Sequence, residues 1–350
     1  MPKGITILIR LINVGSYFIR KMDKPIATGG QAPSPLRLVA RIPVSEGGKR
    51  LDRVLAVLFP DYSRSRLSQW IKAGRVRVDG RSPSPSDRVM GGERVELEVQ
   101  PETEVCWEPQ AIPLRVLFED ESILVIDKPA GLVVHPAAGN PDGTLLNALL
   151  HHAPELAEVP RAGIVHRLDK ETSGLLVVAR TVTSHLRLVE QLQARTMKRE
   201  YQAVVTGVLL AGGTVDAPIG RHRVDRKRMA VTSGGKPAVT HYRVAQRFAA
   251  HTLLKVSLES GRTHQIRVHM AHIRHPLVGD PVYGGRLRIP AGCSGELAET
   301  LRGFRRQALH AGRLGLIHPA SGEAMAWHSP LPEDMARLID VLQSDASRDR

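Results

Sequence analysis

Cysteine and aromatic residues are scarce in this sequence. The two cysteines, Cys106 and Cys293, lie far apart and outside any Cys-x-x-Cys pair. This spacing excludes a disulfide framework and gives no support to a zinc site built from cysteines, so we expect a protein of a reducing compartment, the cytoplasm. Aromatic residues make up 4% of the chain, which argues against the extended base-stacking platform of a general single-strand binder.

Long apolar runs and the glycine-rich signatures of several enzyme classes are also absent. The chain has no stretch of about 18 apolar residues, so the sequence predicts no membrane span. It has no GxxxxGK(S/T) loop, no GxGxxG fingerprint and no GxSxG elbow. Nucleotide hydrolysis, dinucleotide-dependent redox chemistry and esterase chemistry therefore lack their usual anchors.

What the sequence does have is an excess of cations. Lysine and arginine total 49 against 35 acidic residues, which gives a formal net charge of +14 and a pI near 10.3. Such an excess favours a polyanionic partner, because each neutralised phosphate releases condensed counterions. Charge alone does not separate RNA from DNA, from an anionic membrane, or from a basic surface without a specific partner.

The N-terminal 38 residues differ in composition from the rest of the chain. The first 25 are apolar and basic. They lack the uninterrupted apolar core and the small-residue cleavage site of a secretory signal. Residues 26–40 are rich in Gly, Pro, Ser and Ala, as linkers are. We predict a disordered extension over residues 1–38, or a start of translation at Met22. A transit peptide is a further alternative.

Residues 39–110 have the pattern of a small domain with two helices and several strands. Apolar residues between Leu51 and Leu58 fall at helical spacing, and a second short helix ends at Gly74. The alternation at Val76 and Val78 begins the strands. Basic residues near the two helices could contact a phosphate backbone: Arg50, Arg53, Arg64, Arg66, Lys72 and Arg75. A solvated surface explains these charges equally well.

The string RLDRVLAVLFPDYSRSRLSQWIKAGRVRVDGR resembles the RNA-binding domain of the ribosomal protein S4 family. The likeness covers roughly residues 49–110, and the Ser-Arg-Ser helix start and the Gly-x-Val-x-Val-Asp-Gly exit are its more specific parts. This resemblance implies a small α/β RNA-binding domain, and it favours RNA over DNA as the partner.

The pattern of residues 114–345 predicts a second, larger domain of the α+β class. Helices are expected over 144–152 and 184–194, the latter capped by Ser184 and with Leu186 among its buried residues. Because no strict strand-helix-strand alternation recurs, we predict a large mixed, mainly antiparallel sheet with flanking helices. The segments that read as strands are rich in β-branched residues: ILVIDKP, GLVVHP, GLLVVA, QAVVTG and LLKVSLES.

Two patterns in this domain could carry chemistry. The string THQIRVHMAHIRHP holds four histidines, and its spacing could place His269 and His272 on one helical face as metal ligands. No HExxH pair supplies a zinc-activating base, and a phosphate-facing helix fits the string at least as well. The string GIVHRLDKETSGLLVVAR places Asp169 in a polar turn between two strands, where Arg167 and Lys170 would favour an ionised carboxylate. Spacing alone favours the simpler role, in which Asp169 caps the turn, as aspartate commonly does.

Four strings, in order along the chain, resemble the RluA/RluD family of pseudouridine synthases, most closely its branch that acts on large-subunit ribosomal RNA: HRLDKETSGLLVVART, KREYQAVVTG, SGRTHQIRVHMAHIRHPLVGDPVYGG and RQALHAGRLGLIHPASGEAMAWHSPLP. An S4-like domain ahead of them is also that family's layout. The resemblance implies Asp169 as the catalytic carboxylate, Tyr201 as the active-site tyrosine and Arg267 as the basic partner of the aspartate. It also implies substrate contacts at His166, Arg167, Leu168, Arg262, His264 and Gln265.

The resemblance further implies that uridine is isomerised to pseudouridine without a cofactor or a metal, with RNA as the partner. Nothing in the sequence demands more than a monomer, which is what we expect. We expect Arg267 to hold Asp169 by a bidentate pair, and we expect a flipped-out uridine. Asp169 could attack the anomeric carbon or remove a ribose proton. Two other functions stay open, a non-catalytic RNA-binding or ribosome assembly factor and a metal-dependent hydrolase built on the histidines. Other ribosomal sites and transfer RNA are possible targets.

Overall fold

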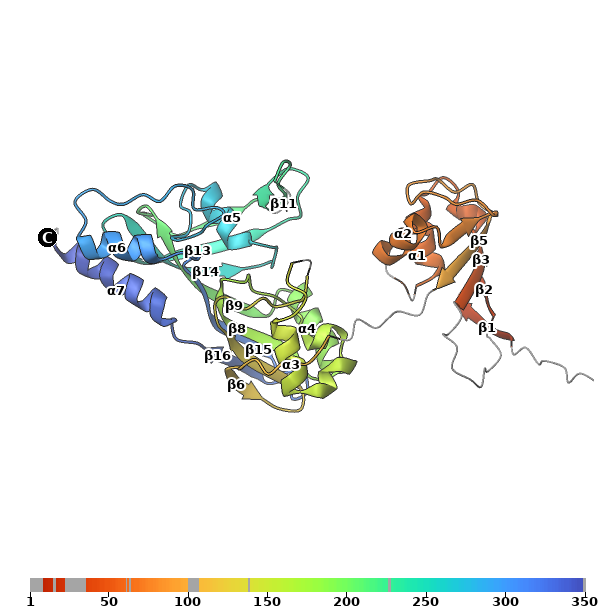
Figure 1. The fold of residues 1–350 in the computed structure, drawn as a ribbon, viewed down its shortest axis with the longest axis horizontal. Coiled ribbons are helices and arrows are strands. Elements are labelled where there is room, and N and C mark those ends of the chain that lie inside the picture. The colour runs from red at the N-terminus through yellow and green to blue at the C-terminus, as the bar shows by residue number, and fades with distance from the viewer. Residues whose placement is uncertain are drawn as a thin grey trace, which may run out of the picture. The chain divides into compact units, whose positions relative to one another are not determined.

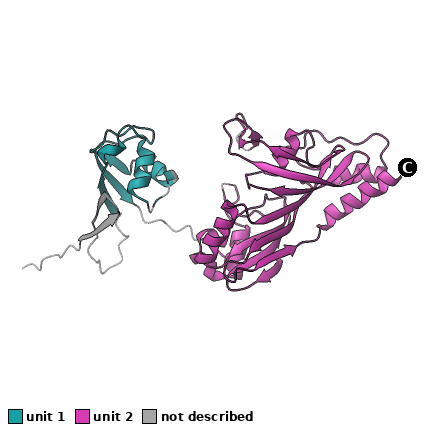
Figure 2. Ribbon diagram, turned by 180° about the vertical axis from the view of Figure 1, so that it is seen from behind, with its two compact units in different colours: residues 1–106 teal, residues 107–350 magenta. Residues whose placement is uncertain are grey.

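The computed structural model of the chain forms two compact units, Met1–Cys106 and Trp107–Arg350, each with its own core (Figure 2). Our domain limits of 39–110 and 114–345 stay predictions. Within residues 1–38, where we predicted disorder, the structure has strands β1 (Ile9–Val14) and β2 (Tyr17–Met22) and the start of β3, and the other residues lie outside the described ones. The described residues are 9–14, 17–22, 36–60, 62, 64–99, 107–137, 139–225 and 228–348.

The smaller unit has one antiparallel sheet and two helices, α1 (Leu51–Leu58) and α2 (Arg64–Lys72). The strand order is β1-β2-β3-β5-β4, where β3 is Leu36–Arg41, β4 is Val76–Val78 and β5 is Arg94–Val99. The apolar residues at helical spacing form its core, because they lie on the faces of α1 and α2 that pack together. The predicted helices and strands of this domain are confirmed.

The larger unit is built on a sheet that contains nine strands within its described residues, and only β8 and β15 pair in parallel (Figure 1). Eight strands follow the order β10-β13-β14-β9-β15-β8-β7-β6, and β16 pairs with β15. Two further strands, β11 (Ile219–Arg221) and β12 (Met229–Val231), pair with each other. The strands of the large sheet are β6 (Val116–Glu119), β7 (Ile123–Lys128), β8 (Ser173–Ala179), β9 (Lys198–Thr206), β10 (Gly213–Asp216), β13 (Val239–Arg247), β14 (His251–Leu258), β15 (Leu309–Ile317) and β16 (Ala324–His328). The predicted α+β class is confirmed.

Both faces of the central strands are buried, which explains their nearly continuous apolar sequences. In β9, Ala203 and Val205 point into one core cluster and Val204 points into another on the opposite face. Helices α3 and α5 pack on the first face, whereas α6 and α7, side by side in Figure 1, pack on the second. The helices of this unit are α3 (Leu145–His152), α4 (Val182–Gln193), α5 (Gln265–His272), α6 (Gly295–Gly303) and α7 (Glu333–Arg348).

Helix α4 differs in detail from its prediction. Its cap is Thr181, whose hydroxyl accepts the amide hydrogen of Ser184 at 3.1 Å, so Ser184 lies inside the helix and not at its start. Leu186 is 58% exposed, and Leu188 is buried instead. Ser184 and Leu188 lie one turn apart and so share a face of the helix, and this face is the buried one.

Candidate active site

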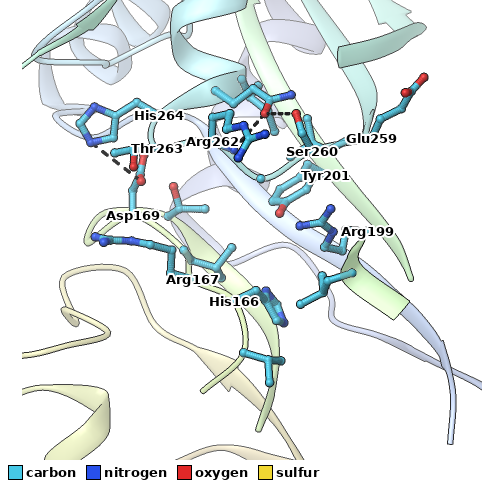
Figure 3. A pocket seen from close by; sticks show the side chains of 18 of the residues that line it. His166, Arg167, Asp169, Arg199, Tyr201, Glu259, Ser260, Arg262, Thr263 and His264 are labelled. Carbon is cyan, nitrogen blue, oxygen red and sulfur yellow. Dashed lines mark hydrogen bonds and ion pairs between the residues drawn. The ribbon is translucent and has the colours of Figure 1, made fainter. Parts of the chain in front are cut away.

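A cavity of about 530 Å³ lies in the larger unit, on the face of the sheet that carries Tyr201. This volume lies within the range of sites that enclose a small organic group. Figure 3 shows the side chains that line it. They come mainly from the turn at 166–169, from the start of β9 and from residues 258–267, which end β14 and begin α5. Segments far apart in the sequence therefore meet at one cavity.

The turn that carries Asp169 is fixed by a buried ammonium group. Lys128, at the end of β7, is 1% exposed and donates to three backbone carbonyl oxygens, at 2.7, 3.0 and 3.0 Å: those of Pro129, Leu132 and Lys170. Burial lowers the pKa of Lys128 to about 7, although the negative charges of Glu171 and Asp169 act against this shift. The ammonium group thus ties the segment after β7 to the turn that follows Asp169.

The carboxylate of Asp169 is held by Arg267 of helix α5. Arg267 Nη1 donates to Asp169 Oδ2 at 3.0 Å, and the two side chains are 5% and 16% exposed. Arg267 Nε and Nη2 donate instead to Asp280 Oδ2 and Oδ1, at 2.7 and 2.9 Å. Our expectation of a bidentate pair between Arg267 and Asp169 is therefore wrong. Asp280 occupies the Nε edge of the guanidinium and leaves one Nη1 hydrogen bond for Asp169.

Asp280 is itself fixed in place. Its side chain is 0% exposed, and Oδ1 also accepts the backbone hydrogens of Val282 and Tyr283 at 2.9 and 3.0 Å. Burial would raise the pKa of Asp280, but Arg267 and the two amides hold it below its usual value. Burial also opposes the charge on Arg267, yet the two carboxylates, Asp280 foremost, raise the pKa of Arg267 above its usual value. Both groups are therefore charged at neutral pH.

Tyr201 forms a wall of the cavity beside Asp169. In Figure 3 it lies between Asp169 on one side and Arg199 on the other. The side chain is 6% exposed, and burial raises the pKa of its hydroxyl, an effect that the Arg199 charge opposes and the Asp169 charge increases. The hydroxyl is therefore protonated at neutral pH. A flat aromatic face with a polar tip suits a planar polar ring.

His264 approaches the other oxygen of Asp169. Its Nε2 lies 3.9 Å from Asp169 Oδ1, and its Nδ1 lies 2.8 Å from Tyr283 Oη. Because Tyr283 Oη already accepts the amide hydrogen of Met229 at 2.9 Å, its own hydrogen is directed at Nδ1 of His264. Burial lowers the pKa of His264, although the Asp169 charge acts against the shift. A neutral ring that accepts the Tyr283 hydrogen at Nδ1 carries its own hydrogen on Nε2, which faces Asp169.

Two residues that we assigned to substrate contact, Leu168 and Gln265, are buried. Leu168 is 4% exposed and belongs to the main core. Gln265 is 3% exposed, and its amide oxygen accepts from the Ser260 hydroxyl and the Arg262 amide, at 2.8 and 3.0 Å. Its amide nitrogen donates to the carbonyl oxygen of Val239 at 2.9 Å. Both residues line the cavity, and their contact with the substrate stays a prediction.

The other predicted contacts of this unit line the cavity. His166 Nε2 accepts the amide hydrogen of Val177 at 3.2 Å, and burial lowers the pKa of His166 to about 3, with the Arg199 charge adding to this shift. Arg167 and Arg262 are exposed at the cavity rim. Neither Arg167 nor Lys170 forms an ion pair with Asp169 among the described residues, so the sequence neighbours that we named do not hold the carboxylate.

Two further histidines of the cluster, His269 and His275, form local hydrogen bonds. His269 is 0% exposed, with Nδ1 at 2.8 Å from Thr240 Oγ1 and Nε2 at 2.9 Å from the Ala217 carbonyl oxygen. His275 Nδ1 lies 2.9 Å from the Thr206 carbonyl oxygen. Within the described ranges no three His, Cys, Asp or Glu side chains gather in a way that could hold a metal ion.

Of the six cations that we assigned to RNA contact in the smaller unit, three bind other side chains of the unit. Arg50 and Arg64 both donate to the buried Asp52, at 2.9–3.2 Å. The guanidinium of Arg66 lies over the ring of Trp70, 4.8 Å from its centroid. The other three are exposed or half-buried: Arg53, Lys72 and Arg75. Their contact with RNA stays a prediction.

Sequence reasoning missed three residues that build the site. Asp280 drew notice only as the acid nearest the histidine cluster, and no local pattern pairs it with Arg267. The sequence does contain a hint at Lys128, because in ILVIDKP this lysine stands at the end of an apolar strand, where side chains are usually buried. It contains another at Arg199, since the alternation in KREYQAVV puts this residue on the same face of the strand as Tyr201.

Comparison with known proteins agrees with this geometry. A family model described as RNA pseudouridylate synthase matches residues 122–272, which include Asp169, Tyr201 and Arg267. An S4 domain model matches residues 49–95, which lie in the smaller unit. Among the described residues, no helix is both long enough and apolar enough to cross a membrane.

Relatives match over nearly the whole chain. The ribosomal large subunit pseudouridine synthase D of Pseudomonas aeruginosa is 60% identical over 310 residues, 89% of this chain and 97% of that protein. The Xanthomonas campestris protein of the same name is 59% identical over 309 residues, 88% of this chain and 93% of the relative. The solved structure of human RNA pseudouridylate synthase domain containing 4 superposes with a TM-score of 0.52 at 27% identity, covering 65% of this chain and 93% of its own. On this similarity, the chain belongs to the RNA pseudouridylate synthase family.

Proposed function

We propose that this protein isomerises specific uridines of large-subunit ribosomal RNA to pseudouridine, with Asp169 as the nucleophile or base. One observation carries the proposal: the Asp169 carboxylate lines a cavity and is held there by the buried guanidinium of Arg267. The substrate class comes from the printed names of relatives that are 59% and 60% identical. Catalytic roles for Tyr201 and Arg267 belong to the same proposal.

The reaction exchanges one bond to the ribose for another. The bond from C1′ to uracil N1 breaks, the base turns over, and a bond from C1′ to C5 forms. The C5 proton leaves and N1 gains a proton, so the atoms balance without a redox partner or an external group. Asp169 can act by adding to C1′, or by taking the C2′ proton and later returning it. Both routes need the carboxylate charged before the reaction.

Arg267, Tyr201 and the cavity walls have separate parts in this scheme. The hydrogen bond from Arg267 Nη1 stabilises and aims the charged carboxylate. The ring of Tyr201 offers a face for the uracil, and its protonated hydroxyl can donate a hydrogen bond or a proton. The 16% exposure of the Asp169 side chain leaves one opening, and a bound nucleotide would close it against water.

RNA binding is assigned to both units. A stacked uridine cannot reach the cavity, so it has to be extruded at a cost of a few kcal/mol, which backbone contacts can offset. Exposed cations that can make these contacts are Arg53 and Lys72 in the smaller unit and Arg167 and Arg262 at the cavity rim. We further propose that the protein acts in the cytoplasm, in line with its cysteine usage, and as a monomer.

The test follows the hydrogen on uracil C5. Large-subunit ribosomal RNA from cells lacking the gene, labelled with tritium at uridine C5, is incubated with the purified chain. Release of tritium to water reports the exchange of bonds. We expect release by the natural chain and none by Asp169→Asn, with RNA affinity retained. Asp142→Asn, which alters an exposed carboxylate, is the matched control.

The outcomes separate the competing functions. Full activity of Asp169→Asn would remove the assigned role of this carboxylate. Binding without any release by the natural chain would favour a non-catalytic assembly factor. Release from transfer RNA alone would overturn the substrate class while keeping the enzyme. Mapping the modified positions in RNA from cells with and without the gene identifies the target uridines.

A further inference from the structure

Strand β9 carries an arginine where its pattern calls for a core residue. Side chains at alternate positions of a strand share one face. On this face Tyr201, Ala203 and Val205 belong to the main hydrophobic core. Arg199 continues the same row and is 9% exposed. The sequence therefore places a permanent positive charge next to the core, at the end of the row that reaches the cavity.

This guanidinium has no partner among the described residues. No hydrogen bond or ion pair joins it to them, and its Nε is buried and unsatisfied. Other buried cations of the unit are compensated: Arg267 by two carboxylates and Lys128 by three carbonyl oxygens. A buried charge without a partner is strongly unfavourable. Arg199 is thus the exception, and its free donors face the cavity that holds Asp169.

The cavity wall leaves room for this group. A Cβ atom at Gly261 would lie 2.9 Å from Arg199 Nη1, so any larger residue there would displace the guanidinium. In Figure 3, Arg199 and Asp169 lie on opposite sides of Tyr201. A uracil on the ring of Tyr201, with its ribose at Asp169, would therefore point the edge far from the ribose toward Arg199.

We propose that Arg199 is a catalytic and specificity residue that binds the uracil carbonyl oxygen opposite the glycosidic bond. In uridine this oxygen is O4, because C4 lies across the ring from N1. After the base has turned over, C2 lies across from C5, so O2 takes the same place. One fixed donor can therefore hold the base both before and after rotation.

The charge of Arg199 fits the detached base better than the bound substrate. When the bond from C1′ to N1 breaks, its electron pair leaves with the uracil, and the negative charge spreads onto O2 and O4. An unpaired cation stabilises this anion more than it stabilises neutral uridine, which is the condition for faster chemistry. Cytidine presents an amino group at the same place, and two donors would then face each other.

The experiment pairs a protein change with a substrate change, and it rests on the proposed function. A stem-loop RNA containing a mapped target uridine is made with uridine or with 4-thiouridine at that position, since sulfur accepts hydrogen bonds weakly. Single-turnover rates and RNA dissociation constants are measured for the natural chain and for Arg199→Met. We expect Arg199→Met to slow the uridine reaction by about 100-fold or more, as loss of an oxyanion donor does, with little change in RNA affinity. The 4-thiouridine should slow the natural chain but not the variant further.

Two more variants distinguish loss of the Arg199 contact from unfolding and from a general loss of positive charge. Gly261→Ala should slow the reaction in the same way without a change in melting temperature, because the Arg199 tip can move aside. Arg161→Met removes an exposed cation from the same cavity. It should weaken RNA binding without lowering the single-turnover rate of the bound RNA. Full activity of Arg199→Met, weaker binding alone, or equal slowing by sulfur in both proteins would overturn the inference. An inactive natural chain would instead overturn the proposed function.

Discussion

The Asp280→Asn substitution tests whether Arg267 needs its second carboxylate. Asparagine keeps the shape of aspartate but loses the charge, so Arg267 would retain only Asp169 as a charged partner. The structure gives Asp280 two charge-assisted hydrogen bonds from Arg267, at 2.7 and 2.9 Å, in a site where its side chain is 0% exposed. Arg267 would then be free to turn toward Asp169, and the Asp169 carboxylate would lose its defined position.

The size and the pH dependence of the effect follow from these contacts. Removing one partner of a buried ion pair destabilises a protein by about 3–5 kcal/mol, and the oxygen that asparagine keeps places this variant near the lower end. The pKa of Asp280 is lowered in the folded chain. Its stabilisation is therefore present above the unfolded value of about 4 and is lost as the pH falls through the lower folded value. The gap in stability should be widest at neutral pH and should narrow at lower pH.

Urea unfolding at a series of pH values and single-turnover tritium release measure the two effects. Asp334→Asn is the matched control, because Asp334 also binds an arginine, Arg306, through two hydrogen bonds of 2.5 and 2.7 Å, but its side chain is 48% exposed. We expect a loss of about 1 kcal/mol or less for this control, as exposed pairs contribute little. Equal stability losses in the two variants, or full turnover by folded Asp280→Asn, would refute the reasoning.

Three further variants test the site of the larger unit and the exposed cations of the smaller one. Lys128→Met should destabilise the chain by about 1–3 kcal/mol for each carbonyl oxygen left without a donor, and should slow turnover. It should also remove a rise in stability between pH about 7 and about 10, because the lowered pKa of Lys128 makes the folded chain release its proton first; thermal unfolding against pH measures both. Tyr283→Phe should move the acid limb of the pH–rate profile to higher pH, since Nδ1 of His264 loses its donor and can take a proton. Removing Arg53 and Lys72 together should weaken RNA binding and reduce the slope of log affinity against log salt by about 1–2, measured by titration at several salt concentrations.

Local patterns predicted the elements of this fold better than their faces. The two helices of the smaller unit were predicted by apolar spacing because each packs through a single stripe against one sheet. Helix α4 was placed within two residues, but Leu186 was assigned to its buried face and is exposed. A helix with apolar residues on several sides can rest on more than one of them, and the sheet, which is assembled from distant segments, decides which.

The family resemblance identified single residues of the candidate site, but not the contacts between them. Asp169, Tyr201 and Arg267 line one cavity, although only a short motif around each was visible in the sequence. The partner of Arg267 was not predictable, because Asp280 lies beyond the end of α5 and meets the guanidinium only after the chain has turned back. Charged neighbours in sequence misled for the same reason, since Arg167 and Lys170 flank Asp169 but are exposed and form no ion pair with it among the described residues.

The charges in the cavity explain why two carboxylates and two guanidinium groups belong together. Before the reaction, Asp169 and Asp280 share Arg267, and Arg199 is unpaired. In the proposed reaction, Asp169 loses its negative charge whether it bonds to C1′ or takes the C2′ proton, and a negative charge arises on the uracil. Arg267 then remains paired through Asp280, and the new anion lies against Arg199. Either chemical route thus moves one negative charge across Tyr201 between two fixed cations, and neither cation is left buried and alone once the base is free. Asp280→Asn and Arg199→Met should therefore each slow the step that breaks the N1 bond, and the two variants combined should show whether both act on the same transfer of charge.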